Sequence, residues 1–304
     1  MIRNGFHPMR VLMIFCGFNV TNLPSARLPF WDKRRNLAMF LAYNSDILAE
    51  ADFHVTPNNR AFQYGDGLFE TIRYEAGRLW FWPDHFERLT TGMAALHLNR
   101  PADFTAEALQ QRIRHLLRTN DLTDQPARVK VQVWRQDGGL YTPATNDAHV
   151  LITTKAGQPF AITQNVKIEI YGAFRVTPSP VSAFKTVNAL PYVLAGIYRQ
   201  QNGFDEVILL DAHGHLAECV ASNLFWFQNG TLYTPSLQTG CVNGIARRQL
   251  LRAFPDAQEG LFKPAVLNDA DPVFAANVAG IQVFGQLTGT RTERIRRIFT
   301  DVAE

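Results

Sequence analysis

The chain has 304 residues, of which 46% are hydrophobic and 19% charged, so it can bury a sizeable core and is long enough for two domains. Its formal net charge of +3 is too small at this length to indicate a nucleic-acid partner. The three cysteines, Cys16, Cys219 and Cys241, are widely spaced and lack metal-ligand spacing. They predict free thiols in a reducing cytoplasm, with neither disulfides nor a metal site.

The first 38 residues combine an apolar run with basic residues on both sides. Residues 11–20 form an apolar run between two arginines and a Pro-Ser-Ala segment, which has the layout of a secretory signal but is too short to span a bilayer. Basic residues at 27 and 33–35 argue against export. We expect residues 1–38 to be an extension, either poorly ordered or preceding a native start at Met39; a targeting segment is the alternative.

The first half of the remaining chain predicts strands and two helices. Strands are expected over residues 40–43, 48–55, 68–74, 128–134 and 150–154. Asp84 is a candidate N-cap for a helix that continues to residue 96, and a second amphipathic helix is expected over residues 106–118.

The second half reads as mainly strands with flanking helices. Strands are expected over residues 166–171, 206–210 and from 217 onward, with a hairpin at Asn229-Gly230. A helix over residues 189–202 has one apolar face, made of Leu190, Val193, Leu194, Ile197 and Tyr198. With a linker between residues 155 and 165, we expect an N-terminal domain over 39–160 and a C-terminal domain over 161–304.

Two charged residues stand in largely apolar surroundings. Desolvation lowers the pKa of an amine and frees its lone pair, so Lys185 is a candidate for Schiff-base formation; the alternative is a lysine at the rim of the fold. Glu218 lies in the run Leu216-Ala217-Glu218-Cys219-Val220. A buried carboxylate needs a partner, and a pyridinium nitrogen is one.

Two segments combine glycines with a regular element. Residues 64–73, Tyr-Gly-Asp-Gly-Leu-Phe-Glu-Thr-Ile-Arg, place two glycines before a strand. Residues 239–248, Thr-Gly-Cys-Val-Asn-Gly-Ile-Ala-Arg-Arg, place two before a helix, whose free N–H groups and dipole would face a phosphate.

Together these segments resemble the class IV, or fold type IV, pyridoxal-phosphate enzymes, which include branched-chain and D-amino-acid aminotransferases and aminodeoxychorismate lyase. The resemblance covers residues 39–290. It implies an α+β fold of two domains, a smaller α/β N-terminal domain and a larger, mainly β C-terminal domain with flanking helices that binds the cofactor. It also implies pyridoxal phosphate as cofactor and a homodimer.

The resemblance assigns roles to individual residues. Lys185 would hold pyridoxal phosphate as a Schiff base and act as general acid and base, while Glu218 keeps the pyridine nitrogen protonated. The phosphate ligands that it implies are Arg88, in a His-x-x-Arg-Leu pattern, Ile245, Ala246 and Asn277, which stands where branched-chain enzymes have a threonine. The expected substrate contacts are Tyr64, Arg128, Arg135, Val278 and Ala279. Both of these arginines can also be read as surface or structural residues.

The reaction is less well determined than the cofactor. Branched-chain aminotransferases carry a tyrosine five residues after the lysine, where this chain has Leu190, and the Lys-x-x-Asn-x-Leu spacing resembles aminodeoxychorismate lyase. Both reactions pass through one carbanion, so the same apparatus serves either. We predict a cytoplasmic aminotransferase acting between amino acids and 2-oxo acids. The alternatives are aminodeoxychorismate lyase and a protein that binds pyridoxal phosphate without turnover; no nucleic acid, membrane or metal is expected.

Overall fold

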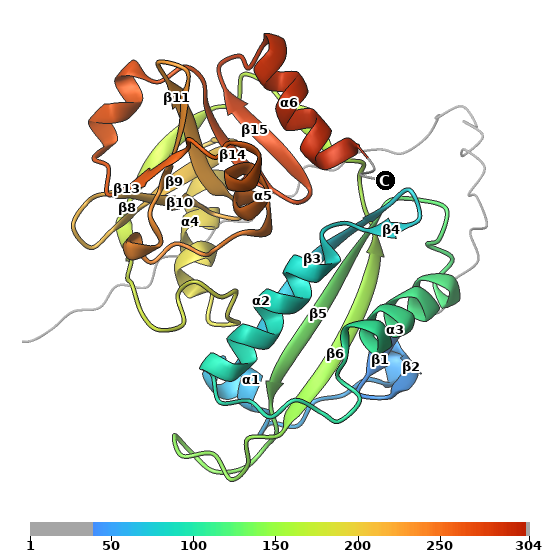
Figure 1. Ribbon diagram of the computed structural model, residues 1–304. Helices are drawn as coiled ribbons and strands as arrows, with labels where there is room; N and C mark the ends of the chain where they lie inside the picture. Colours follow the sequence, from blue (N-terminus) through green and yellow to red (C-terminus); the bar gives the residue numbers. More distant parts are fainter. Residues whose placement is uncertain (1–38, 302–304) are drawn as a thin grey trace, which may run out of the picture. The chain divides into compact units, whose positions relative to one another are not determined.

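The computed structural model describes residues 39–301 (Figure 1). The predictions made for residues 1–38 and for Cys16 lie outside the described residues. The described chain belongs to one compact unit, and its division into two domains near residue 160 stays a prediction. No helix within residues 39–301 is long and apolar enough to cross a membrane.

A six-stranded antiparallel sheet is built from the first half of the described chain, in the order β2-β1-β6-β5-β3-β4. Its strands are β1 (Phe40–Tyr43), β2 (Asp46–Ala49), β3 (Gly67–Glu75), β4 (Arg78–Leu79), β5 (Ala127–Arg135) and β6 (Ala148–Ala156). The helices in this half are α1 (Arg60–Tyr64), α2 (Trp82–Ala95) and α3 (Ala106–Thr119), with a short 3-10 turn, η1 (Glu50–Asp52). Most of the predicted elements are therefore confirmed, but the strand predicted over residues 48–55 is wrong beyond residue 49, because the chain turns there into the 3-10 helix η1.

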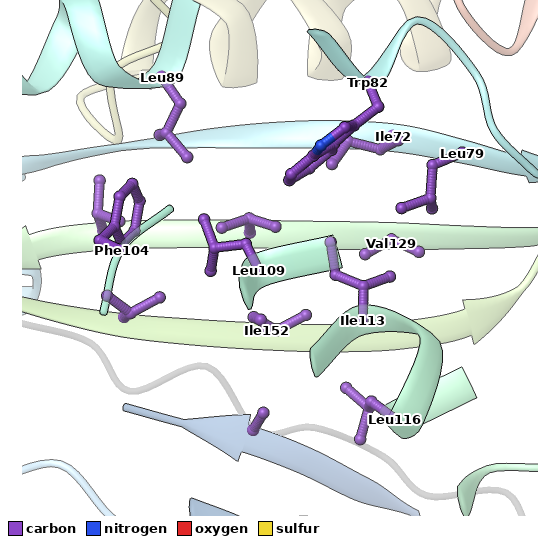
Figure 2. Close-up of a cluster of buried hydrophobic side chains, with 14 of the residues drawn as sticks. Ile72, Leu79, Trp82, Leu89, Phe104, Leu109, Ile113, Leu116, Val129 and Ile152 are labelled. Atoms are coloured by element: carbon purple, nitrogen blue, oxygen red, sulfur yellow. The ribbon is translucent and has the colours of Figure 1, made fainter. Parts of the chain in front are cut away.

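One face of this sheet is buried because its apolar residues alternate along the strands. Val129 of β5 and Ile152 of β6 pack against Leu109 and Ile113 of α3, all fully buried (Figure 2). The residues that alternate with these apolar ones along β5, such as Lys130, point to the opposite face of the sheet and are only partly buried. That opposite face is therefore free to take part in a site.

Two further sheets come from residue 161 onward, one ordered β10-β9-β8 and one ordered β13-β12-β11-β14-β15-β7. The strands are β7 (Ala161–Thr163), β8 (Ile168–Val176), β9 (Glu206–Asp211), β10 (Leu216–Cys219), β11 (Asn223–Gln228), β12 (Thr231–Pro235), β13 (Gln258–Gly260), β14 (Val273–Asn277) and β15 (Gly280–Phe284). The helical elements are α4 (Leu190–Gln201), α5 (Ile245–Ala253), α6 (Gly289–Thr300), η2 (Leu237–Thr239) and η3 (Pro264–Asp269). The predicted hairpin at Asn229-Gly230 joins β11 to β12, and the mixture of helices and strands confirms the α+β class.

Helix α4 turns its apolar stripe away from the core of this chain. Exposed on one side of the helix are Leu190, Val193, Leu194 and Ile197. Its other side, with Tyr192, Ala195 and Tyr198, packs in the cluster that includes Tyr171 and Leu209 of the small sheet. The apolar pattern predicted the helix, but not which of its faces would be covered.

Candidate active site

The segment that carries Lys185 lies against one end of strand β3. The amide of Phe69 donates to the Lys185 carbonyl oxygen, and the amide of Val187 donates to the Gly67 carbonyl oxygen, both at 2.9 Å. At Gly67 a Cβ would lie 2.4 Å from the carbonyl oxygen of Val133, so only glycine allows this close approach of β3 to β5. Backbone hydrogen bonds therefore fix the position of Lys185.

The amine of Lys185 is held in partly buried surroundings. Its Nζ lies 5.0 Å from the centroid of the Phe69 ring. Burial lowers the pKa of Lys185 and the charge of Arg88 lowers it further, whereas Glu218 and Glu70 act in the opposite direction. An amine with a lowered pKa has a free lone pair more often, which attack on a carbonyl requires.

Glu218, on strand β10, is a buried carboxylate with neutral donors around it. The Tyr192 hydroxyl donates to Oε1 at 2.7 Å, and the amide of Val242 lies 3.2 Å from both carboxylate oxygens. Burial raises the pKa of Glu218 to about 7, although these hydrogen bonds act to lower it. No lysine or arginine within residues 39–301 forms an ion pair with it, so the carboxylate is available to a cationic ligand.

Arg88, on helix α2, is held by a carboxylate from strand β3. Its Nε and Nη2 donate to the two oxygens of Glu70 at 2.7 and 2.6 Å, and His85 Nδ1 lies 2.6 Å from Glu70 Oε2. Burial acts to raise the pKa of Glu70, but the charge of Arg88 and the hydrogen bonds from His85 and Arg88 outweigh burial and lower it to about 2. Arg88 Nη1 donates to the carbonyl oxygen of Asn243 at 2.9 Å. The arginine therefore lies next to the start of helix α5.

Helix α5 begins without a side-chain cap. Its N-cap is Gly244, where a Cβ would lie 2.0 Å from Asn223 Oδ1. The amides of Ile245 and Ala246 donate to no acceptor within the described residues. Free amides at a helix N-terminus favour an anion, and the neighbouring guanidinium of Arg88 adds a positive charge.

Asn277, at the end of strand β14, uses its side chain within the protein. Its Nδ2 donates to Ser222 Oγ at 3.0 Å and to the Ala221 carbonyl oxygen at 3.2 Å. Its Oδ1 accepts from the amides of Ala279 and Gly280. The side chain thus holds the turn between β14 and β15 against the segment after Glu218, and its contact with a phosphate stays a prediction.

The predicted substrate residues lie in different surroundings. Tyr64 ends helix α1 and lies beneath the guanidinium of Arg60, 4.9 Å from it. Arg128 is exposed on β5, and Val278 and Ala279 form the turn between β14 and β15. Their substrate roles stay predictions.

Arg135 is the predicted substrate residue with the most protein contacts. It is 6% exposed and forms an ion pair with Asp66. It also donates to Asn146 Oδ1 and to the carbonyl oxygens of Leu96 and His97. These contacts agree with the alternative that Arg135 is a structural residue. Its role in binding substrate stays a prediction.

Sequence reasoning gave no role to Glu70, Lys130 or Tyr192. Glu70 lies within the run 64–73, but its contact with Arg88 depends on how α2 crosses β3. Tyr192 follows Lys185 by seven residues and lies on the buried side of α4. The apolar stripe drew attention to the opposite side of this helix, which is exposed. The alternation of charged residues with Val129 and Val131 was the available signal for Lys130.

Comparison with known proteins identifies the family of this chain. A family model described as "Amino-transferase class IV" matches residues 67–282, a range that contains Arg88, Lys185, Glu218, Asn277 and the start of α5. The aminodeoxychorismate lyase of Bacillus subtilis (strain 168) is 27% identical over 77% of this chain and 81% of that protein. The branched-chain-amino-acid aminotransferase of Escherichia coli (strain K12) is 25% identical over 86% of this chain and 92% of that protein.

Solved structures show the same fold. The crystal structure of the Escherichia coli branched-chain aminotransferase has a TM-score of 0.76 at 23% identity and covers 86% of this chain and 93% of that one. A second branched-chain aminotransferase, that of T.th. with pyridoxamine 5'-phosphate, has a TM-score of 0.75 at 22% identity over the same shares of the two chains. The resemblance inferred from the motifs is thereby confirmed, and the protein is an enzyme that belongs to the class IV aminotransferase family.

Proposed function

We propose that the protein is a pyridoxal-phosphate-dependent aminotransferase that moves an amino group between an amino acid and a 2-oxo acid. The observation that carries this proposal is the position of Val242 and Asn243. The amide of Val242 contacts Glu218, the carbonyl oxygen of Asn243 accepts from Arg88, and the amide of Asn243 donates to the carbonyl oxygen of Ala183, two residues before Lys185. One dipeptide thus connects the amine, the buried acid and the arginine.

The side chains and amides at this place suit each part of pyridoxal phosphate. Its phosphate group requires N–H donors and positive charge, which Arg88 and the amides of Ile245 and Ala246 can supply. Its ring nitrogen requires a buried acid, and Glu218 is 4% exposed. Its aldehyde requires an amine with a lowered pKa, as burial produces at Lys185.

The chemistry follows from these positions. When bound, pyridoxal phosphate links to a primary amine and accepts the electron pair released at the adjacent carbon. Lys185 would supply the amine for that link, and its Nζ, once released, would take a proton from the substrate carbon as a base and then donate a proton elsewhere as an acid, since return to the same carbon would transfer no amino group. Glu218 keeps the ring nitrogen protonated, and Arg88 with the α5 amides fixes the orientation of the reacting carbon.

Aminodeoxychorismate lyase is the second candidate function. The position five residues after Lys185, where branched-chain aminotransferases carry a tyrosine, is Leu190, which is 60% exposed. The hydroxyl group expected of a branched-chain enzyme is therefore missing at that position, and a lyase is among the relatives. Both reactions begin with loss of a proton to Lys185, so the cofactor-binding residues serve either.

Borohydride trapping tests the proposal first. Protein purified with pyridoxal phosphate is reduced and digested, and the peptide that contains Lys185 is expected to carry the pyridoxyl adduct in the wild type and to lack it in Lys185→Gln. Next, the wild type is incubated with L- and D-amino acids plus 2-oxoglutarate, and separately with aminodeoxychorismate. Glutamate from the first reaction supports the aminotransferase, and pyruvate with 4-aminobenzoate from the second supports the lyase. The absence of an adduct at Lys185 would refute both, and an adduct with neither product would indicate binding without turnover.

We further infer a homodimer that works on small amino and oxo acids in the cytoplasm. The exposed apolar stripe of α4 supports the dimer, because a row of large apolar side chains is costly to leave in water. The free, buried thiols of Cys219 and Cys241 agree with a reducing compartment.

A further inference from the structure

An open cavity lies at one end of the first sheet, on the face that helix α3 covers (Figure 1). Its volume is about 290 Å³, close to the lower limit of about 300 Å³ for small-molecule pockets. Ala148 and Val150 of β6 line it and also belong to the buried core between the sheet and α3. Strand β5 lies between β6 and β3, the strand against which the Lys185 segment packs. The cavity is therefore separate from the candidate active site.

The lining of this cavity carries charges of both signs. Its arginines are Arg100 and Arg112, and its carboxylates are Asp103 and Asp147. Arg112 pairs with Asp103 and also donates to the carbonyl oxygen of Asn44 at 2.9 Å. Arg100 and Asp147, in contrast, line the cavity without forming an ion pair with each other or with any other described residue. The lining thus keeps one cation and one anion without a partner among the described residues.

Arg100 and Asp147 stand at neighbouring positions of the cavity wall. Asn99, which precedes Arg100, pairs with Asp147 in an isolated β-bridge, and its Nδ2 donates to Asp147 Oδ1 at 2.9 Å. Hydrogen bonds from Asn99 and Thr145 lower the pKa of Asp147, so its carboxylate is charged at neutral pH. Both charged side chains are exposed, which places them where a ligand enters from solvent.

The two segments of this wall are held in place by Arg135. Its guanidinium donates to the carbonyl oxygen of Leu96 on one segment and to Asn146 Oδ1 on the other. The first segment continues to Arg100 and the second to Asp147. A site whose walls are fixed before binding loses less entropy when its ligand binds. The cavity is therefore formed in the absence of a ligand.

We propose that this cavity is a second binding site, which takes the zwitterion of an apolar α-amino acid. The carboxylate of the ligand binds Arg100, its ammonium group binds Asp147, and its side chain packs against Val150. A ligand with one charge of each sign satisfies both unpaired groups, whereas a ligand with a single charge leaves one of them without a partner. Because β5 and β3 separate this ligand from Lys185, it does not react, and the site does not depend on the function proposed above.

L-Valine and isovalerate provide the test, because they differ only in the amino group. The holoenzyme is first treated with borohydride, so that an amino acid can no longer react at Lys185. Each compound is then titrated by calorimetry into the wild type, Arg100→Gln and Asp147→Asn. The matched controls are Arg118→Gln and Asp124→Asn, which remove the same charges at exposed positions outside the cavity lining.

The wild type is expected to bind one L-valine per chain, roughly tenfold to a hundredfold more tightly than isovalerate, as a hydrogen bond between charged groups allows. Asp147→Asn should bind L-valine no more tightly than isovalerate, because it lacks the partner of the ammonium group. Arg100→Gln should weaken the binding of both compounds, because both carry the carboxylate. The two control variants should match the wild type.

A wild type that does not bind L-valine, or that binds isovalerate equally well, would overturn the inference. L-Valine binding that both cavity variants leave unchanged would do the same, since the ligand would then lie elsewhere, as would an equal loss in the controls. The two compounds are compared first on the wild type, so the result does not depend on the folding of any variant. Peptide analysis of the same preparation reports the Lys185 adduct, whose absence would refute the proposed function and leave the result for the cavity standing.

Discussion

The hydroxyl of Tyr192 donates a 2.7 Å hydrogen bond to Oε1 of Glu218, and this bond ties helix α4 to the buried acid of the candidate site. Lys185 and Tyr192 lie in one continuous segment, the loop before α4 and its first turn. One end of this segment carries the amine of Lys185, and the other end, at Tyr192, orients the carboxylate of Glu218. A change at Tyr192 should consequently alter the cofactor site without touching Lys185.

Tyr192→Phe removes this hydrogen bond and keeps the ring. Glu218 would then keep only the Val242 amide, and its negative charge would be harder to maintain in a buried position. We expect roughly tenfold to a hundredfold weaker binding of pyridoxal phosphate, because a hydrogen bond to a charged group contributes about 1.5 to 3 kcal/mol. Absorbance titration of the cofactor-free protein with pyridoxal phosphate measures the affinity.

Tyr198→Phe is the matched control for this change. Tyr198 lies on the same helix and packs against Tyr171 at 5.1 Å between ring centroids, and its hydroxyl forms no hydrogen bond with residues 39–301. The Tyr198→Phe variant should therefore bind pyridoxal phosphate as tightly as the wild type. If Tyr192→Phe also binds pyridoxal phosphate as tightly as the wild type, the hydrogen bond does not contribute to the cofactor site.

Glu70→Gln should destabilise the fold by leaving Arg88 buried without a counter-charge. Arg88 is 4% exposed, and removal of one partner of a buried ion pair costs about 3 to 5 kcal/mol. Chemical denaturation of the cofactor-free protein measures the loss. Glu87→Gln is the control, since Glu87 pairs with Arg248 at the surface with a side-chain exposure of 59%, where such pairs contribute about 0 to 1 kcal/mol.

A second variant separates charge from packing at this pair. If the uncompensated charge is the cause, adding Arg88→Met to Glu70→Gln should recover part of the lost stability, because the double variant no longer buries a lone cation. Strictly additive losses in the double variant would contradict this explanation.

How far the sequence predicts this site depends on the range of each interaction. The alternation along β5 and the hairpin at Asn229-Gly230 are local signals, and both are confirmed. The Glu70–Arg88 contact joins residues on two packed elements, so no local spacing could reveal it. Lys185 and Glu218 could be singled out because an isolated charge in an apolar run is itself a local signal.

The N-cap prediction for Asp84 was wrong, and the reason is local competition. Helix α2 begins at Trp82 with Phe81 as its N-cap, and no side chain caps it. Pro83 is favoured in the first turn because it lacks an amide hydrogen to satisfy. This displaces Asp84 into that turn, where its carboxylate binds Arg252 and Gln249 of α5.

The stability of the cofactor-free protein should fall as the pH rises through neutrality. Burial raises the pKa of Glu218 from its ordinary value of 4.5 to about 7. A carboxyl group whose pKa is higher in the folded state stabilises the fold while it is protonated, so its contribution is complete below pH 4.5 and is lost as the pH rises through about 7. Calorimetric melting between about pH 5 and pH 8 should show a wild-type loss that Glu218→Gln reduces.

Glu206→Gln is the control for this prediction, because Glu206 is a buried acid that does not contact Lys185. It shows how much such an acid contributes to the dependence of stability on pH. Burial also raises the pKa of Glu206, so this variant should reduce the loss in the same direction. Pyridoxal phosphate separates the two, since a cationic ring nitrogen would stabilise only the charged form of Glu218. With the cofactor bound, the part of the loss due to Glu218 should disappear, and a curve unchanged by the cofactor would speak against contact between Glu218 and the ring.

The apolar stripe of helix α4 should hold two copies of the chain together. Ile197→Lys places a charge among Val193 and Leu194, and burying a charge without a partner is strongly unfavourable. Sedimentation velocity should show a wild-type dimer and a mostly monomeric variant at the same concentration. Leu261→Lys is the matched control, because Leu261 is 47% exposed and Ile197 45%, so both substitutions add one lysine at an equally exposed apolar site. A monomeric wild type, or two variants that dissociate alike, would show that the stripe is not the dimer contact.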